Sequence, residues 1–279
     1  MSRRFRLVDV FGERSLQGNP LAVVIDSDGL STDEMLEITR WLGFSETTFL
    51  GPPETPDADY RVRIFTLAGE LPFAGHPTLG TCHVWADLSA DEPPEMTQEC
   101  GAGLVRLRRR DGLLSFEAPP LIRQGPVDED DLARFTAVLG IDRSAVVSAS
   151  WVDNGPGWVG LLLGDADAVL ALEPDVSRDT GEGPLDIGVV GKYPAGSGRA
   201  VEVRGFFSDD MGHLREDPVT GSLNASLAQW LVGEGILPGS YVAGQGTRVG
   251  RRGRVVVETD DVGGIWIGGR VSDVVTGHI

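Results

Sequence analysis

The feature that most constrains the fold of this chain is an internal duplication. Residues 70–76 read Glu-Leu-Pro-Phe-Ala-Gly-His and residues 216–222 read Glu-Asp-Pro-Val-Thr-Gly-Ser, so both follow the order acid, any residue, Pro, apolar, small, Gly, polar. Each copy is preceded by a Val-Arg-x-Phe tetrad, at residues 62–65 and 203–206. A tetrad and a motif that recur together in the same order predict two similar halves rather than one irregular domain.

Two further segments support the duplication. Residues 31–43 align with residues 128–140, and each segment has Thr four positions before its last Gly and Leu one position before it. Ser31 and Glu34 have the spacing of a helix capping box, and Gly43 is a typical helix terminator. The apolar residues of this predicted helix share one face, namely Met35, Ile38, Trp41 and Leu42.

A second helix is predicted to begin at each copy of the motif. In the first half, Pro77 suits the first helical position after His76, and the segment to Leu88 is almost free of charge. Its counterpart, residues 222–232, is similarly apolar. Neither segment is amphipathic, so we expect both helices to be buried on all sides.

These patterns predict an α+β fold of two pseudo-symmetric domains. Each domain is expected to be a curved, mostly antiparallel sheet or half-barrel around a central buried helix. We predict an N-terminal domain at residues 1–122 and a C-terminal domain at 123–279, since residues 119–127 hold the Pro and Gly typical of a linker. The sequence leaves open whether the last strand, within residues 265–279, stays with the second domain or returns to the first.

The charge balance restricts the binding partners. The chain has 24 basic and 42 acidic residues, which gives a net charge of −18. This charge disfavours nucleic acid and anionic membrane surfaces as partners. The N-terminus lacks the apolar stretch of a signal peptide, and no run approaches the ~18–20 apolar residues of a membrane helix. We therefore expect a cytoplasmic protein, and its two cysteines predict neither a disulfide framework nor a zinc site.

The duplicated motif has a chemical consequence. A helix N-terminus presents unpaired amides and about half a unit of positive charge. Gly75 and Gly221 let ligand atoms approach that backbone without a Cβ in the way. If the halves pack about a pseudo-twofold axis, both helix ends face one cleft, which suits a small carboxylate held without metal or cofactor.

A difference between the halves points to Glu46. After the first capped helix the chain reads Phe-Ser-Glu-Thr at residues 44–47, whereas the aligned residues 141–144 read Ile-Asp-Arg-Ser. Glu46 therefore has no acidic counterpart in the aligned position. It lies in an apolar segment typical of a strand, where a carboxyl group has a raised pKa and can act as a base.

Structural interpretations remain open for each of these residues. Glu46 could be a solvated strand residue, and His76 and Ser222 could be only helix caps. Asp217, which precedes a proline, could simply favour a turn. A metal bound by His76 and His83, with Cys82 next to the latter, lacks a third ligand with convincing spacing, and no nucleophile elbow or phosphate-binding loop is present.

Several motifs together resemble one known family. They are Val8-Asp9-Val10-Phe11, Gly18-Asn19-Pro20-Leu21-Ala22-Val23-Val24, Ser45-Glu46-Thr47-Thr48-Phe49, Glu70 to Gly80 and Glu216 to Ser222. In this order they resemble the PhzF-like proteins of phenazine biosynthesis, from about residue 5 to the end. The resemblance implies the diaminopimelate-epimerase fold, which has two pseudo-symmetric domains with the site between them.

The resemblance also implies roles for single residues. Amino-acid epimerases of this fold place one cysteine at the head of each central helix, and the matching positions here are Ala74 and Thr220. PhzF-like proteins use a glutamate instead, which matches Glu46. His76 and Asp217 match polar residues of the substrate site.

The remaining implied contacts are backbone and hydroxyl groups. The amides around Gly75, Gly221 and Ser222 would bind the substrate carboxylate or a neighbouring group. The resemblance further implies a homodimer.

Three functions follow from these observations. The first is a cofactor-independent isomerase that moves a proton on a small carboxylate-bearing substrate of the dihydro-hydroxyanthranilate type, with Glu46 as the base. The second is an amino-acid epimerase or racemase that uses Glu46 with another base. The third is a non-catalytic protein that binds small anions.

Overall fold

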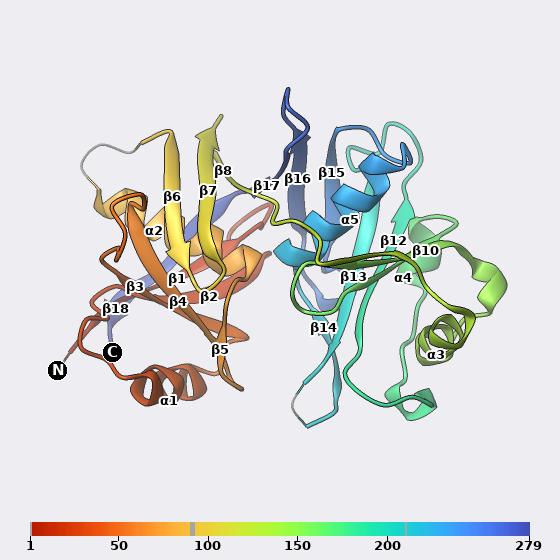
Figure 1. Ribbon diagram of the computed structural model, residues 1–279, viewed down its shortest axis with the longest axis horizontal. Helices are drawn as coiled ribbons and strands as arrows, with labels where there is room; N and C mark the ends of the chain where they lie inside the picture. Colours follow the sequence, from red (N-terminus) through yellow and green to blue (C-terminus); the bar gives the residue numbers. More distant parts are fainter. Residues whose placement is uncertain (1, 90–92, 210) are drawn as a thin grey trace. The chain divides into compact units, whose positions relative to one another are not determined.

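The structure, a computed structural model, describes residues 2–89, 93–209 and 211–279. It divides into two compact units, Met1–Glu117 with Trp266–Ile279 and Ala118–Ile265. The sequence placed the boundary a few residues later, at 122–123, and left the last strand unassigned. In the structure the last strand belongs to the first unit (Figure 1).

The first unit contains two helices and a long series of strands. The helices are α1 (Thr32–Leu42) and α2 (Gly75–Leu88). The strands are β1 (Arg4–Val10), β2 (Asn19–Val24), β3 (Glu46–Gly51), β4 (Tyr60–Thr66), β5 (Glu70–Leu71), β6 (Glu95–Cys100), β7 (Gly103–Arg110), β8 (Leu113–Glu117), β17 (Ile265–Gly269) and β18 (Val271–His278).

The strands of this unit pair in one continuous order. It runs β18, β1, β2, β3, β4, β6, β7, β8 and β17, with β5 also paired to β4. The β2–β3 and β4–β6 pairs are parallel, and the other pairs in this order are antiparallel.

The second unit repeats this plan. Its helices are α3 (Glu129–Leu139), α4 (Ala166–Leu170) and α5 (Gly221–Gly233), with 3-10 turns η1 (Arg143–Ala145), η2 (Val176–Arg178) and η3 (Thr247–Val249). Its strands are β9 (Arg123–Pro126), β10 (Val146–Asp153), β11 (Val159–Leu163), β12 (Asp186–Lys192), β13 (Val201–Ser208), β14 (Leu214–Asp217), β15 (Ser240–Gln245) and β16 (Gly253–Thr259).

The pairing order confirms the duplication. The second unit runs β9, β10, β11, β12, β13, β15 and β16, with β14 on β13, and here the β11–β12 and β13–β15 pairs are parallel. Each strand from β10 to β16 therefore has a counterpart nine positions earlier in the strand numbering. The linker expected at residues 119–127 contains β9, which pairs with β10 and so belongs to the second sheet.

The central helices α2 and α5 pack inside the two sheets. Helix α2 contacts β1 to β4 and β8. A Cβ on Gly80 of α2 would lie 2.5 Å from a methyl group of Leu21 and 3.0 Å from one of Val8. This glycine therefore lets α2 approach β1 and β2 closely.

The second unit achieves the same close approach with glycines on its strands. A Cβ on Gly188 of β12 would lie 2.2 Å from a methyl group of Leu223 on α5, and one on Gly160 of β11 would lie 2.9 Å from Leu227. Leu223 and Leu227 are buried. The glycine that permits the close approach therefore lies on the helix in the first unit and on the strands in the second.

The predicted helix ends are partly confirmed. The capping box of Ser31 and Glu34 is present, and Gly43 ends α1 with a φ of 71°. The starts of the central helices were predicted too late, because α2 begins at Gly75 rather than Pro77 and α5 at Gly221 rather than Ser222. Proline is tolerated in the first turn of α2, where its missing N–H would have no intrahelical partner.

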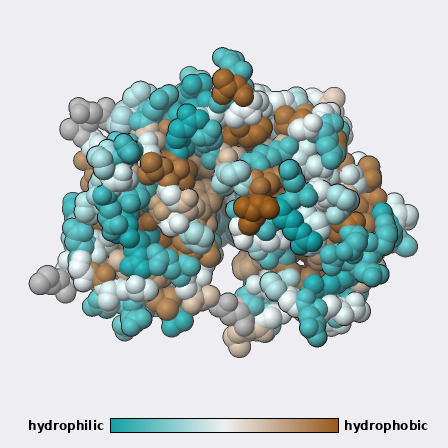
Figure 2. Space-filling model, in the orientation of Figure 1, coloured by the Kyte–Doolittle hydropathy of each residue, from teal (hydrophilic) through white to brown (hydrophobic). Residues whose placement is uncertain are grey.

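The predicted apolar face of α1 is wrong at one position. Met35 is buried, but Trp41 is 78% exposed. Figure 2 shows hydrophilic residues interspersed with apolar ones on the face in view. Among the residues that the structure describes, no helix is long and apolar enough to cross a membrane.

Candidate active site

The first candidate residues meet at the head of α2. Glu46 is the first residue of β3 and pairs with Thr66 of β4. Its side chain is only 18% exposed, and its Oε2 lies 3.5 Å from Nε2 of His76, which is 4% exposed. His76 is the second residue of α2. The fold therefore places a carboxyl group and an imidazole together in a largely dry environment.

The surroundings of His76 determine its protonation. Nδ2 of Asn19, at the start of β2, lies 3.3 Å from Nδ1 of His76. An amide nitrogen only donates, so Nδ1 accepts and Nε2 carries the proton. Burial lowers the pKa of His76 to about 3, so the ring is neutral near pH 7. A neutral imidazole thus directs its N–H toward Glu46.

Both central helices begin without a side-chain cap. The N-cap of α2 is Ala74 and that of α5 is Thr220, and neither side chain bonds to the first turn of its helix. These are the positions that match the cysteines of epimerases. The first-turn amides at Gly75 and Gly221 keep the partial positive charge of a helix end.

The second motif forms its own polar cluster in the second unit. Asp217 is the last residue of β14, and its Oδ2 accepts a hydrogen bond of 2.6 Å from Oγ1 of Thr220. Gln245 holds this turn, because its Nε2 donates to the carbonyl of Asp217 at 3.2 Å and its Oε1 accepts from the N–H of Thr220 at 3.0 Å. Gln245 is fully buried.

Gln245 was missed at the sequence level. It lies in a Gly-x-Gly segment that predicts only a hairpin turn. The signal that could have identified it is a lone amide side chain between two glycines, since a buried amide needs partners for both its donor and its acceptor.

Gly221 and Ser222 are the first two residues of α5. The hydroxyl of Ser222 accepts a hydrogen bond of 3.2 Å from Nε1 of Trp158, and its carbonyl accepts one of 3.0 Å from Nδ2 of Asn154. The structure therefore brings Glu46, Gly75 and His76 together in the first unit, and Asp217, Gly221 and Ser222 together in the second.

The expectation that Glu46 lacks an acidic counterpart is wrong. Thr47, which follows Glu46, pairs with Phe65, and Ile187, which follows Asp186, pairs with Phe206. These two phenylalanines end the duplicated Val-Arg-x-Phe tetrads. Asp186 is thus the counterpart of Glu46. The alignment of residues 31–43 with 128–140 was wrong, because α1 lies between β2 and β3 whereas α3 precedes β10, the counterpart of β1, and Asp186 was therefore missed.

The cysteines and histidines do not support the metal alternative. Burial raises the pKa of the Cys82 thiol to about 12, which leaves it a neutral, inert thiol. Nε2 of His83 lies 3.2 Å from Oδ2 of Asp273 on β18. Within residues 2–89, 93–209 and 211–279, no three His, Cys, Asp or Glu side chains are grouped closely enough to hold a metal ion.

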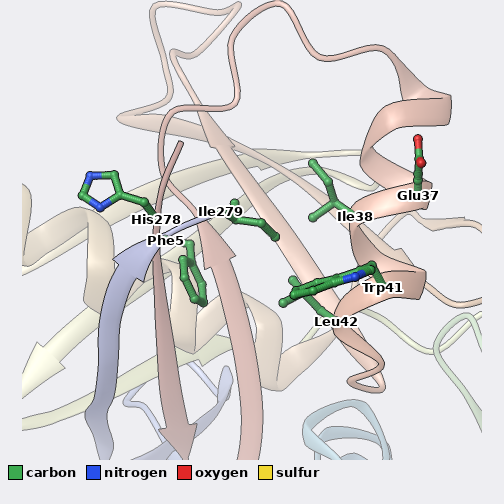
Figure 3. Close-up of a pocket in the computed structure, with 7 residues that line it drawn as sticks. All are labelled: Phe5, Glu37, Ile38, Trp41, Leu42, His278 and Ile279. Atoms are coloured by element: carbon green, nitrogen blue, oxygen red, sulfur yellow. The ribbon is translucent and has the colours of Figure 1, made fainter. Parts of the chain in front are cut away.

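A separate apolar groove is formed in part by side chains of α1. It has a volume of about 510 Å³ and is lined by Phe5, Glu37, Ile38, Trp41, Leu42, His278 and Ile279 (Figure 3). It contains none of the candidate residues, and its two ionisable side chains, Glu37 and His278, lie at opposite sides of it (Figure 3). Its volume alone does not make it the reaction site.

The fold and the two polar clusters define a duplicated α+β protein with a carboxyl group beside the head of each buried helix. The family model described as "Phenazine biosynthesis-like protein" matches residues 8–272. The chain belongs to this family. The α+β class and the resemblance found in the sequence are thereby confirmed.

Similar proteins cover almost the whole chain. The chain is 32% identical to Antisense-enhancing sequence 1 of Schizosaccharomyces pombe, over 98% of this chain and 97% of that protein. It is 33% identical to the trans-2,3-dihydro-3-hydroxyanthranilate isomerase of Pseudomonas aeruginosa, over 93% of this chain and 91% of the relative.

A solved structure shows the same fold. The phenazine biosynthesis protein of Bacillus anthracis, from the PhzF family, superposes with a TM-score of 0.82 at 21% identity, covering 100% of this chain and 99% of that one. The enzyme class expected from the sequence, isomerase, is confirmed at the level of the family, because its named enzymes include isomerases.

Proposed function

We propose that this protein is an isomerase that moves a proton within a small carboxylate-bearing substrate by general acid/base catalysis, without a cofactor. Glu46 is the group that removes the proton. The observation that carries this proposal is the pairing of Glu46 with a neutral, buried His76 at the uncapped head of α2.

The neighbours of Glu46 suit a base. Neutral His76 lies beside the carboxylate without adding the positive charge that a protonated imidazole would bring. The amides at Gly75 and the following turn are suited to bind the substrate carboxylate. Asp217, Gly221 and Ser222 are proposed to bind its remaining polar groups.

The reaction conserves every atom of the substrate. Glu46 removes a proton from a carbon next to a double bond, and the electron pair of the broken C–H bond forms a new double bond. The displaced π pair then takes a proton at another carbon. The result is a shifted double bond, with no net oxidation and no group lost.

A dihydroaromatic amino acid fits this chemistry. The relative from Pseudomonas aeruginosa is named for the isomerisation of trans-2,3-dihydro-3-hydroxyanthranilate. We propose a substrate of this type for the present chain.

A homodimer is also proposed, on the basis of the family resemblance, and light scattering tests it.

The experiment follows proton exchange directly. The protein is incubated in deuterated water with trans-2,3-dihydro-3-hydroxyanthranilate, other dihydroaromatic acids and ordinary amino acids, and products are followed by NMR and mass spectrometry. We expect deuterium incorporation and a shifted double bond in wild type, and neither in Glu46→Gln.

The matched control is Glu37→Gln, because Glu37 is an exposed glutamate on α1. It should exchange like wild type. Full activity of folded Glu46→Gln would refute the proposed role. Ligand binding without exchange across the panel would instead favour an anion-binding protein.

A further inference from the structure

The imidazole of His76 lies between two polar side chains of the first unit. Nδ2 of Asn19, the first residue of β2, lies 3.3 Å from Nδ1 of the ring. Oε2 of Glu46 lies 3.5 Å from the other ring nitrogen, Nε2. Each ring nitrogen therefore faces a different group, an amide on one side and a carboxyl group on the other.

Burial makes the contact with Asn19 decisive for the tautomer of His76. Asn19 is fully buried and His76 is only 4% exposed. A ring with its proton on Nδ1 would set that N–H against the N–H of the amide, and it would present the lone pair of Nε2 to Glu46. Because a buried polar group without a suitable partner costs about 1–3 kcal/mol, this tautomer is disfavoured.

The position of Asn19 is fixed by the backbone that precedes it. Asp9 of β1, which is 4% exposed, accepts the N–H groups of Gln17 at 3.2 Å and Gly18 at 3.0 Å. A Cβ on Gly18 would lie 2.1 Å from the carbonyl oxygen of Val10, and Val10 pairs with Asn19 across the two strands. The amide of Asn19 is thus held in place independently of its contact with the ring.

We propose that Asn19 is a positioning residue of this enzyme, which holds the proton of His76 on Nε2 so that an N–H and not a lone pair faces Glu46. This inference rests on the proposed function. Asn19 acts through His76 and takes no part in proton transfer itself. An N–H beside Glu46 favours its charged form, which is the form that can remove a proton, whereas a lone pair there would favour the protonated form.

The wild-type protein tests the tautomer directly. With histidine labelled by ¹⁵N, a ring nitrogen that carries a proton and one that does not have clearly separate chemical shifts. The chain has four histidines, so the spectrum of His76→Gln assigns the resonances of His76. We expect a protonated Nε2 and a bare Nδ1 at pH 7. His213, at 59% exposure, is the internal reference.

Asn19→Asp reverses the contact at nearly constant size. A carboxylate only accepts, so Nδ1 of His76 should become protonated, while the resonances of His213 stay as in wild type. The probe for turnover is trans-2,3-dihydro-3-hydroxyanthranilate, or whichever acid of the panel exchanges. We expect kcat to fall by about a hundredfold, the range for loss of an oriented acid–base group, with a smaller change in KM.

Asn19→Ala provides a second variant that introduces no charge. A hydrogen bond that a bare ring nitrogen accepts displaces its ¹⁵N resonance. Removal of the amide should therefore move the Nδ1 resonance of His76 away from its wild-type position and leave that of His213 unchanged.

The outcomes separate the two proposals. A wild-type His76 with its proton on Nδ1, a bare Nδ1 in Asn19→Asp, or a reversed tautomer with wild-type kcat overturns the role of Asn19 and leaves the proposed function standing. If Asn19→Asp does not fold, an unmoved Nδ1 resonance in Asn19→Ala overturns that role. Exchange that is unaffected in Glu46→Gln, or absent with every probe, overturns both.

Discussion

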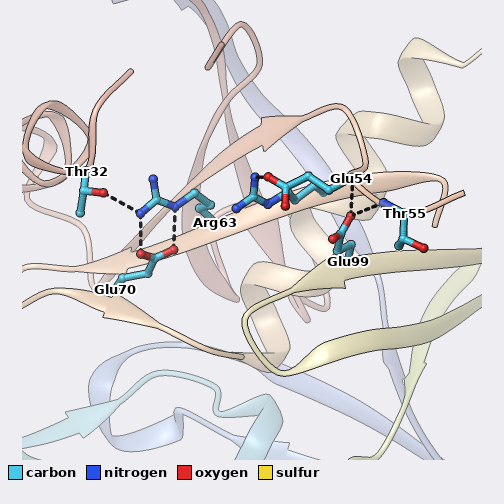
Figure 4. Close-up of polar contacts among 7 residues, drawn as sticks. Thr32, Glu54, Thr55, Arg63, Glu70 and Glu99 are labelled. Carbon is cyan, nitrogen blue, oxygen red and sulfur yellow. Dashed lines mark hydrogen bonds and ion pairs between the residues drawn. The ribbon is translucent and has the colours of Figure 1, made fainter. Parts of the chain in front are cut away.

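Arg204 and Glu216 form a nearly buried ion pair, with Nη2 and Oε2 2.7 Å apart and only 4% and 11% of their side chains exposed. The first unit contains the counterpart of this pair. There Nη2 of Arg63 lies 2.5 Å from Oε2 of Glu70, at 21% and 38% exposure (Figure 4). The acid that opens each copy of the motif is thus bound by the arginine of the preceding tetrad.

The phenylalanine of each tetrad takes part in the same arrangement. The guanidinium carbon of Arg63 lies 5.1 Å from the ring centre of Phe65, and that of Arg204 lies 4.8 Å from the ring centre of Phe206. These contacts explain why Val-Arg-x-Phe and the motif acid recur together. They hold the segment that leads into each central helix.

The two ion pairs should differ in their effect on stability. We expect Glu216→Ala to lower the free energy of unfolding by about 3–5 kcal/mol, because it leaves the charge of Arg204 buried without its partner. Glu70→Ala should lower it by about 1 kcal/mol or less, because Arg63 remains partly hydrated. Urea unfolding monitored by circular dichroism measures both.

The exposed pair serves as the matched control. Equal losses in the two variants would mean that burial does not set the strength of these pairs. A smaller loss in Glu216→Ala than in Glu70→Ala would contradict the expectation directly.

Local signals were sufficient for much of the fold. The capping box at Ser31, the terminators Gly43 and Gly140, and the central helices almost free of charge all depend on neighbouring residues, and the structure shows each of them. The two-fold repeat was also readable, because the motif residues form the same contacts in both units.

The errors concern contacts between residues far apart in the sequence. Asp186 was missed because the sequence alignment matched α1 with α3, which lie at different places in the strand order, and only strand pairing identifies the counterpart of Glu46. Gln245 was missed because its partners, Asp217 on β14 and Asn224 on α5, are distant in the sequence. Trp41 follows the helical period of α1, yet it is exposed in a groove beside Ile279.

Protonation of His76 should destabilise the protein in acid. Its pKa is lowered to about 3 in the folded state and is about 6.5 when unfolded, so the unfolded state binds the extra proton between these values. The stability is therefore complete above about pH 6.5 and falls, by about 1.4 kcal/mol per pH unit from this group, as the pH decreases toward 3.

His76→Gln removes this contribution to the pH dependence. Its free energy of unfolding should fall less steeply between pH 6 and pH 4 than that of wild type, as measured by urea titrations at each pH. His213→Gln is the control, because His213 is 59% exposed. An unchanged slope in His76→Gln would show that the imidazole reaches water in the folded state.

Close packing of α5 against β12 gives a third expectation. Gly188→Ala should lower the free energy of unfolding by about 1–3 kcal/mol, because the new Cβ would lie 2.2 Å from a methyl group of buried Leu223. Gly164→Ala has no atom within 4 Å of its Cβ and is the control. Thermal unfolding of the two variants measures the difference, and an equally stable Gly188→Ala would mean that α5 can shift freely.

Asp186 should make the protein less stable as the pH rises. Its pKa is about 7 when folded and about 3.9 when unfolded, so the folded state retains a proton that the unfolded state loses between these values. Stability from this group is complete below about pH 4, decreases through pH 7 and is constant above it. Asp186→Asn removes the ionisation and should match wild type near pH 4.

At pH 8 the Asp186→Asn variant should be more stable than wild type by roughly 2–4 kcal/mol. A pKa shift of about three units corresponds to about 4 kcal/mol, and the partial exposure of Asp186 reduces this value. Urea unfolding at pH 4, 6 and 8 measures this, with Asp261→Asn, an exposed turn residue, as the control. A loss of stability at pH 8 would instead mean that the ionised carboxylate of Asp186 has favourable partners in the folded state.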